Sequence, residues 1–265
     1  MTALAFFDAL AALAEEAQAA FLAGFLVFAR VGAIFALLPA FGEQVVPRRV
    51  RLILAFAMTL VVAPAALPLI DVRPETPAEI AFYIGSETAV GLALGAGLRL
   101  LVMVLQIAGT MAAQSTSLAQ FFGGAGVDPQ PAISQVLVMA GLALLVMAGL
   151  PERAAQFLIL SYQLLPAGQW PDAAVLAEWG TARVAHAFAL AFVLAAPFVI
   201  GSAIYNMALG AINRAMPQLM VAFIGSPAIT WGGLVLLMLA APAILTVWFG
   251  AFQAYLTDPT SVRGP

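Results

Sequence analysis

Cysteine and lysine are absent from this sequence of 265 residues, and histidine occurs once, as His186. Without cysteine the chain can form no disulfide, thiolate nucleophile or iron–sulfur cluster, and one histidine cannot complete a metal site built on paired His or Cys ligands. A nucleotide-binding phosphate loop is excluded because it needs a lysine. The sequence therefore predicts no catalytic residue, no metal and no cofactor, and we interpret His186 as a packed or interfacial side chain.

Charged residues are also few. They make up only 9% of the chain, against 64% hydrophobic residues, and the mean hydropathy is +1.05. Soluble domains carry about 25% charged residues, so this composition indicates an integral membrane protein. The formal net charge is -3 and every basic residue is an arginine. This balance gives no electrostatic basis for binding nucleic acid.

Uncharged runs mark the expected membrane helices, because a span needs about 20 apolar residues to cross about 30 Å of hydrocarbon. The expected helical segments lie at about 17–41, 52–70, 77–114, 132–150, 184–213 and 215–257. The last run is too long for one straight span, and it is expected to divide at Pro227, Gly232, Gly233 and Pro242. The sequence predicts an all-α, polytopic helical membrane protein of long, broken helices and helical hairpins, with residues 1–265 in one membrane domain.

The first 21 residues differ from the apolar runs that follow them. Apolar side chains recur there at helical spacing with acids between them: the apolar residues are Phe6, Leu10, Leu13 and Phe21, and the acids are Asp8, Glu15 and Glu16. A secretory signal would start with basic residues, which this segment lacks. We expect an amphipathic lead-in to the first apolar helix.

Ionisable side chains inside apolar segments are costly, and they usually face a partner, a pore or the interior of a bundle. Arg30, Glu87 and Arg99 are the residues of this kind. Glu87 and Arg99 are separated by about 18 Å along a helix, so they cannot pair within it. Their partners are expected on other helices, on other subunits or in water. Two kinds of role stay open. In a functional role these side chains line a conduit or an assembly contact. In a structural role each forms an ion pair or extends toward the membrane–water interface.

A glycine-rich and hydroxyl-rich break at 109–129 interrupts an otherwise uncharged region. Irregular backbone at membrane depth is tolerated only where protein buries it or where it lines a water-filled cavity. The break is therefore a candidate constriction, and the alternative is an ordinary surface loop between two helices. Its candidate residues are Gly109, Gln114, Ser115, Ser117, Phe121, Phe122, Gly123, Gly124, Asp128 and Pro129.

Two motifs carry a resemblance to a known family. The stretches "FARVGAIFALLPAFGEQVVPRRVRLILAFAMTLVVAP" (28–64) and "LGAINRAMPQLMVAFIGSP" (209–227) together resemble the FliR family, the R subunit of the flagellar type III export gate. Motif positions and candidate structural or assembly residues are Arg30, Pro39, Phe41, Gly42, Pro47, Arg51, Pro64, Glu87, Arg99, Gly210, Arg214, Pro217, Gln218, Phe223, Gly225 and Pro227. One departure is "AGLPERAAQ", with Pro151, Glu152 and Arg153 where the family usually has a Gly-His pair.

The resemblance implies a non-enzymatic subunit of the bacterial inner membrane and the flagellar basal body. Its implied partners are P and Q subunits (FliP-like and FliQ-like) and the B-type export switch protein (FlhB-like), and its cargo is unfolded flagellar protein. It also implies a P-subunit-like part at about 1–180, a pore plug near 109–127, and a Q-subunit-like hairpin at about 181–257.

Two alternatives to the flagellar subunit stay open. The equivalent subunit of a virulence type III secretion system would share the fold and the motifs. A small-solute secondary transporter would also contain helices broken by proline and glycine, but it should have two halves with matching broken segments. The sequence shows no such symmetry.

Overall fold

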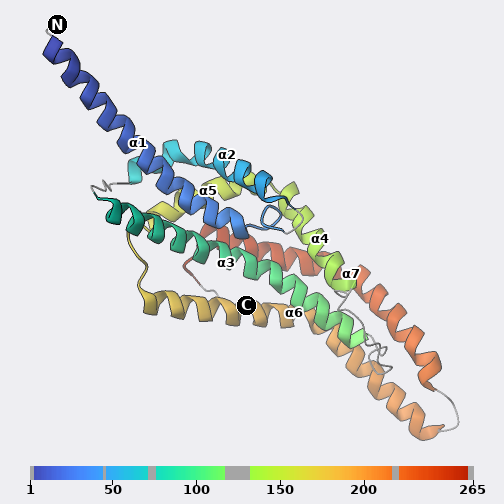
Figure 1. Ribbon diagram of the computed structural model, residues 1–265. Coiled ribbons are helices and arrows are strands. Elements are labelled where there is room, and N and C mark those ends of the chain that lie inside the picture. The colour runs from blue at the N-terminus through green and yellow to red at the C-terminus, as the bar shows by residue number, and fades with distance from the viewer. Residues whose placement is uncertain (1–2, 44–45, 71–75, 117–131, 217–220, 262–265) are drawn as a thin grey trace. The chain divides into compact units, whose positions relative to one another are not determined.

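The computed structural model describes residues 3–43, 46–70, 76–116, 132–216 and 221–261, and within these residues the chain is helical with no strand. The predicted all-α fold is confirmed (Figure 1). The helices are α1 (Ala3–Leu37), α2 (Arg48–Ala66), the short 3-10 helix η1 (Leu67–Leu69), α3 (Pro77–Thr116), α4 (Ala132–Met147), α5 (Leu150–Leu164), α6 (Ala173–Ala215) and α7 (Val221–Thr257).

Five of these helical segments are long and apolar enough to cross a membrane. They are Ala9–Leu37, Arg48–Leu69, Pro77–Ser115, Ala173–Ala215 and Ala228–Thr257. Helices α4 and α5 pass the same test only as a pair, bent by 77° at the break between them. Gly149 lies in this break with φ of +77°, a conformation that glycine adopts without steric cost. The chain is thus a polytopic helical membrane protein, as its composition predicts.

The chain forms two compact units. Unit 1 comprises Met1–Arg99 and Gly149–Gly180, and unit 2 comprises Leu100–Ala148 and Thr181–Pro265. The division expected near residue 180, between a P-subunit-like and a Q-subunit-like part, stays a prediction.

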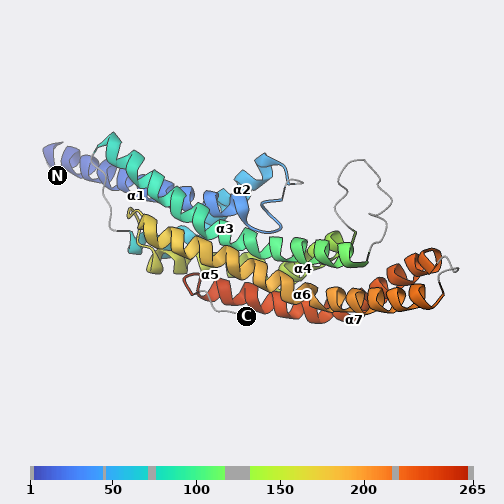
Figure 2. The same ribbon diagram turned by 90° about the horizontal axis from the view of Figure 1, so that it is seen from below.

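In unit 1, α1 packs against α2 and against the first half of α3, and α5 packs against α2 (Figures 1 and 2). Gly91 of α3 is the close-approach point. A Cβ atom built there would lie 2.6 Å from the Arg30 carbonyl oxygen and 2.7 Å from the Ala33 Cβ. Any side chain at position 91 would therefore push α1 away from α3, and this contact sets where Arg30 lies relative to α3.

In unit 2, α4 packs against α7 and against the second half of α3. The indole of Trp248, which is fully buried, reaches across to α3, where its Nε1 donates a 2.6 Å hydrogen bond to the Leu101 carbonyl oxygen. Gly141 of α4 lies against this indole, since a Cβ there would be 3.2 Å from the ring. Helix α7 turns back along the α6 segment that belongs to this unit, and the two make a long hairpin (Figure 1).

Two expectations about helix boundaries are corrected. Helix α7 runs unbroken through Gly232, Gly233 and Pro242, and it also includes Pro227. A proline inside a helix costs about 3 kcal/mol, whereas each backbone group exposed to lipid costs several kcal/mol. Continuing the helix is therefore cheaper than breaking it. The predicted lead-in is helical, and it continues into the first apolar run as the single helix α1.

The second correction concerns the predicted break at 109–129. Helix α3 extends to Thr116, so Gly109, Gln114 and Ser115 are helical and not part of a loop. Gly109 is buried against α4, because a Cβ there would lie 2.3 Å from the Ser134 Cα. The Ser115 hydroxyl donates a 2.8 Å hydrogen bond to the Ala112 carbonyl oxygen. Local side-chain bonding of this kind satisfies hydroxyl groups inside a helix, so serine and threonine do not end α3 where they first appear.

Candidate functional site

Two ionisable side chains meet in the core of unit 1. Arg30 on α1 and Glu87 on α3 are each fully buried, with 0% of the side chain exposed. The Arg30 Nε donates to Glu87 Oε2 at 2.8 Å, and the Arg30 Nη2 donates to Glu87 Oε1 at 3.0 Å. Two parallel bonds between a planar guanidinium and a carboxylate form the strongest kind of charge-assisted pair. Arg30 and Glu87 thus find their charge partners inside the chain.

The remaining donors of Arg30 point to the end of helix α5. Its Nη1 donates to the Ser161 carbonyl oxygen at 3.1 Å and to the Leu165 carbonyl oxygen at 2.9 Å. The Ser161 carbonyl also accepts the Leu165 N–H at 2.9 Å, and the partial negative charge at this end of the helix attracts a cation. Arg30 therefore caps the carboxyl end of α5 and also neutralises the charge of Glu87.

Two further contacts complete the cluster. The Gly168 amide, which follows α5, donates a 3.0 Å hydrogen bond to Glu87 Oε1. The guanidinium carbon of Arg30 lies 3.9 Å from the centre of the Tyr162 ring, which is a cation–π contact. Arg30, Glu87, Ser161, Tyr162, Leu165 and Gly168 are referred to below as the Arg30 cluster. It joins α1, α3, α5 and the segment after α5.

The arrangement favours a structural role for the Arg30 cluster. Both carboxylate oxygens of Glu87 are occupied, and Arg30 is surrounded by acceptors and an aromatic face. A group that transfers protons or binds a ligand needs an accessible atom, and here both side chains are closed to solvent. Within the described residues, no group of three His, Asp or Glu side chains could hold a metal ion.

A second ionic contact holds the turn between α1 and α2. Arg99 of α3 donates from Nη1 to the carboxylate of Glu43, and Arg51 of α2 donates from Nη2 to the Glu43 carbonyl oxygen at 2.9 Å. Arg99 and Glu43 are partly exposed, at 31% and 24%. Glu43 is therefore bound from two helices at once. Of the partners expected for Arg99, the structure shows one in the turn before α2.

Residues of the first motif build the same turn. Gly42 fits only without a side chain, because a Cβ would lie 2.8 Å from the Ala36 and Leu38 carbonyl oxygens. Pro39 is buried, and Pro47 occupies the position just before α2, where a missing N–H leaves no donor unpaired. Ala40 has φ of +67°. These residue types are thus explained by the path of the backbone.

The second motif and the central break are described only in part. Arg214 is exposed in the last turn of α6, and no salt bridge joins it to any described residue. The candidates that lie outside the described residues are Ser117, Phe121, Phe122, Gly123, Gly124, Asp128, Pro129, Pro217 and Gln218. Their predicted roles in a plug and in assembly stay predictions.

Sequence reasoning missed Arg183. Its guanidinium carbon lies 4.6 Å from the centre of the Tyr255 ring, and its Nη2 donates to the Pro259 carbonyl oxygen at 2.7 Å. This contact ties the segment after α7 to α6 in unit 2. Nearby, hydrogen bonds from Thr260 and Ser261 lower the pKa of the exposed carboxyl of Asp258 to about 2, so Asp258 is ionised at neutral pH. No sequence motif marks Arg183, because its partners are backbone carbonyl groups and the face of an aromatic ring.

Comparison with known proteins gives a family. The profile of the family described as bacterial export proteins, family 1, matches residues 21–255. The flagellar biosynthetic protein FliR of Caulobacter vibrioides is 34% identical over 236 residues, which cover 87% of this chain and 93% of the relative. The protein of the same name from Aquifex aeolicus is 29% identical over 241 residues, covering 87% and 89%. That of Bacillus subtilis is 27% identical over 218 residues, covering 76% and 79%.

These matches cover both motifs and nearly all of the described helices. They agree with a chain of several membrane-spanning helices. The chain therefore belongs to the FliR family of bacterial export proteins.

Proposed function

We propose that this chain is the R-type subunit of a flagellar type III export gate in the bacterial inner membrane. It forms a channel for unfolded flagellar proteins together with P-type and Q-type subunits, and it adjoins a B-type switch protein. The observation that carries this proposal is the similarity to flagellar biosynthetic proteins FliR over most of the chain. The subunit acts by assembly and not by catalysis, because the buried side chains of Arg30 and Glu87 bind each other.

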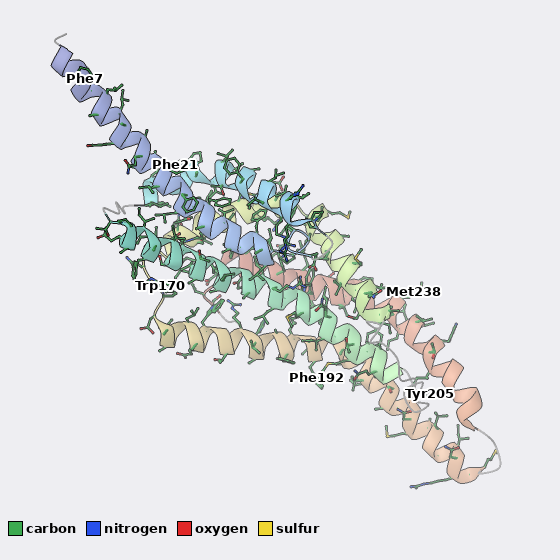
Figure 3. All side chains as sticks on the ribbon, viewed as in Figure 1. Phe7, Phe21, Trp170, Phe192, Tyr205 and Met238 are labelled. Atoms are coloured by element: carbon green, nitrogen blue, oxygen red, sulfur yellow. The ribbon has the colours of Figure 1, made fainter. Side chains whose placement is uncertain are left out.

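The exposed faces of the α6–α7 hairpin support a role in assembly. Large apolar side chains are exposed on both helices, including Ile204 and Met207 on α6 and Trp231 and Met238 on α7 (Figure 3 labels Met238). Small residues such as Gly210 and Gly232 are exposed beside them. Between membrane helices, small residues let backbones approach closely, and van der Waals contact then drives association. Sister subunits are the proposed cover for these faces.

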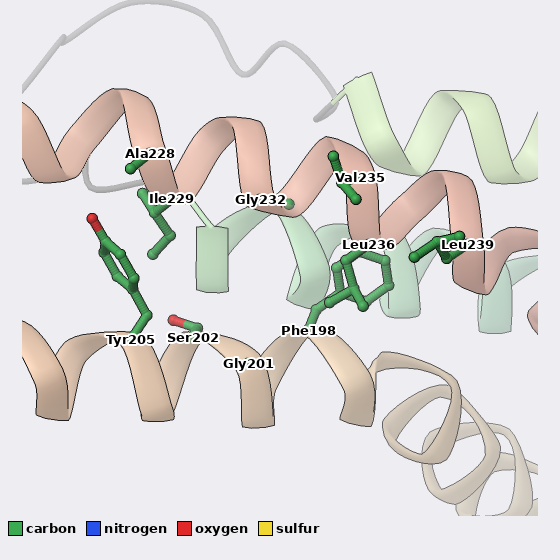
Figure 4. A pocket seen from close by; sticks show the side chains of 11 residues that line it. Phe198, Gly201, Ser202, Tyr205, Ala228, Ile229, Gly232, Val235, Leu236 and Leu239 are labelled. Atoms are coloured by element: carbon green, nitrogen blue, oxygen red, sulfur yellow. The ribbon is translucent and has the colours of Figure 1, made fainter.

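A cavity inside the hairpin supports the same proposal. It measures about 270 Å³ and lies between α6 and α7, with Phe198, Ser202 and Tyr205 on one side and Ile229, Leu236 and Leu239 on the other (Figure 4). Its wall is mostly apolar and includes Gly201, Gly232 and Gly233. A side chain of a neighbouring subunit could fill such a space and fix the hairpin against it.

The roles proposed for individual residues follow from this assembly. Arg214, which is exposed at the end of α6, meets a carboxylate or a carbonyl group of a neighbouring subunit. Phe121 and Phe122, with the glycines and hydroxyl residues around them, form the plug that closes the channel by excluding water. Deleting residues 117–126 is expected to make membranes permeable to small ions, and unchanged permeability in an assembled gate would contradict the plug.

Copurification tests the proposal directly. The tagged full-length chain, expressed with its P-type and Q-type neighbours and extracted in mild detergent, should leave the membrane in one complex with them. Arg214→Ala should lower recovery of this complex, and Arg214→Lys, which keeps the charge, should lower it less. Two results together would contradict the flagellar gate: the chain is extracted without P-type and Q-type subunits, and a strain that lacks its gene still swims. They would favour a virulence system or a transporter.

A further inference from the structure

The first turn of α2 carries two arginines with no charge partner in the part of the chain that the structure describes. Arg48 and Arg49 are both exposed, and no salt bridge or hydrogen bond joins either side chain to a described residue. Glu43, the nearest acid in the sequence, already binds Arg99. This arginine pair therefore has charge and N–H donors to offer to a group outside the chain.

An exposed apolar stripe leads away from the arginine pair along α2. Ile53, Phe56 and Leu60, referred to below as the Ile53 stripe, recur at helical spacing and lie on one face of the helix. Their exposed fractions are 67%, 56% and 62%. Arg49 precedes Ile53 by one turn and lies on the same face. The contacts of α2 with α1 and α5 use another face, where Ala55 is buried.

The length of α2 places the arginine pair at a membrane surface. The apolar segment Arg48–Leu69 has 22 residues and a mean hydropathy of 2.3. At about 1.5 Å per residue it is about 33 Å long, which matches a hydrocarbon core of about 30 Å. Its first residues then lie at the level of the lipid phosphates. Arg51 fixes this end of the helix, because its Nη2 donates to the Glu43 carbonyl oxygen at 2.9 Å.

The positive charge at this end of α2 indicates the kind of ligand. Arginine and lysine gather on the cytoplasmic side of membrane helices, and the cytoplasmic leaflet carries anionic lipids. A guanidinium presents a planar fork of N–H donors that matches the oxygens of a phosphate group. From the phosphate, the acyl chains of a phospholipid run into the hydrocarbon, just as the Ile53 stripe runs from Arg49 along α2. A second copy, inserted in the same direction and packed through this face, would bring arginine against arginine.

We infer that the arginine pair and the Ile53 stripe bind an anionic phospholipid of the cytoplasmic leaflet. Arg48 and Arg49 bind its phosphate group, and an acyl chain lies along the exposed side chains of the Ile53 stripe. The inference goes beyond the proposed gate and does not rest on it, because it needs only a membrane-spanning α2 with the arginine pair at one end.

Lipid retention by the full-length chain tests the inference. The chain is purified in mild detergent, equilibrated with phosphatidylglycerol or with phosphatidylcholine of the same acyl chains, and measured by native mass spectrometry. Phosphatidylglycerol should be retained about tenfold more than the zwitterionic lipid, and this preference should shrink as the salt concentration rises. Equal retention of the two lipids would overturn the inference.

Paired variants separate the headgroup from the acyl chain. Arg48→Gln with Arg49→Gln should remove the preference for phosphatidylglycerol, whereas Arg48→Lys with Arg49→Lys keeps the charge and should keep most of the preference. Ile53→Ala with Leu60→Ala should lower retention of both lipids and leave the preference between them. A preference that survives the loss of both arginines would contradict the phosphate site. If the glutamine variant inserts poorly, the unaltered chain and the lysine variant still decide the inference.

Photo-crosslinking in native membranes distinguishes a lipid from a protein at this face. A diazirine side chain replaces Ile53, and in a second chain it replaces Met238, which is 78% exposed on α7. Position 53 should yield phospholipid adducts, and a crosslink from there to a protein would overturn the inference. Position 238 lies on the face that sister subunits are proposed to cover, so its product reports separately on the gate.

Discussion

Arg30 and Glu87 form a buried ion pair, and Arg30 also caps the carboxyl end of α5. The Arg30 Nε and Nη2 bind the two oxygens of Glu87, and its Nη1 binds the Ser161 and Leu165 carbonyl oxygens at the end of α5. Two buried charges gain little net stability by pairing, because desolvation offsets most of their attraction. The pair instead makes the positions of α1, α3 and α5 depend on one another.

Removing one partner of this pair should be costly. Arg30→Met leaves the buried carboxylate of Glu87 without its cation and removes the side-chain donor of the Leu165 carbonyl oxygen. Breaking a buried ion pair costs about 3–5 kcal/mol. We expect a marked fall in the amount of folded chain in the membrane and a lower thermal stability in detergent, measured by fluorescence-detected size-exclusion chromatography.

The double variant separates two contributions of Arg30 to stability, its ion pair with Glu87 and its hydrogen bonds at the end of α5. Arg30→Met with Glu87→Met should recover part of the stability, since no buried charge is left unpaired. Recovery should be incomplete, because the Leu165 carbonyl oxygen still lacks the donor that Arg30 supplies. A double variant as unstable as the sum of the two single variants would mean that the two side chains do not depend on each other.

The contact of Arg99 with Glu43 should matter far less to stability. Both side chains are partly exposed, and ion pairs in contact with water contribute about 1 kcal/mol or less. Arg99→Gln should therefore change the thermal stability only slightly in detergent, and the change should shrink further at high salt. A loss as large as that of Arg30→Met would contradict the partial exposure of this pair.

Much of the fold could be predicted from the sequence, because membrane helices leave a strong signal in uncharged apolar runs. The helix expected to start near Pro77 does start there, and the second apolar run is α2 followed by η1. Helix ends were less predictable. Proline and glycine in α7 suggested a break, but the need to pair backbone groups in lipid keeps the helix intact.

The candidate site could be predicted in part. Arg30 and Glu87 stand out in the sequence because ionisable groups inside apolar segments need a partner. That they pair with each other follows only from the packing of α1 on α3 at Gly91. The acceptors on α5 are backbone carbonyls, which every residue carries, so no sequence pattern marks them. Glu43 lies within the first motif, yet no residue near it in the sequence indicates Arg99 as its partner.

Gly109 should be intolerant of any side chain for reasons of packing. A Cβ at this position would lie 2.3 Å from the Ser134 Cα, so Gly109→Ala forces α3 away from α4. Overpacking of this kind costs about 1–3 kcal/mol, which exceeds the gain of about 1 kcal/mol from alanine as a helix former. Gly250→Ala is the control, since no atom lies within 4 Å of a Cβ there, and it should leave the thermal stability unchanged or raised. Equal effects of the two substitutions would contradict the close approach of α3 and α4.

Trp248 and Trp231 lie on the same helix, and they should respond differently to the same substitution. Trp248 is fully buried and donates to the Leu101 carbonyl oxygen, whereas Trp231 is 70% exposed. Trp248→Phe removes the donor and leaves space beside Gly141, so we expect a loss of about 1–3 kcal/mol. Trp231→Phe should change the stability of the isolated chain by about 0.5 kcal/mol or less. Thermal unfolding of both variants in one detergent measures the difference. If Trp231→Phe instead weakens recovery of a complex while leaving the lone chain unchanged, then the exposed face of α7 is an assembly surface and Trp248 belongs to the core that supports it.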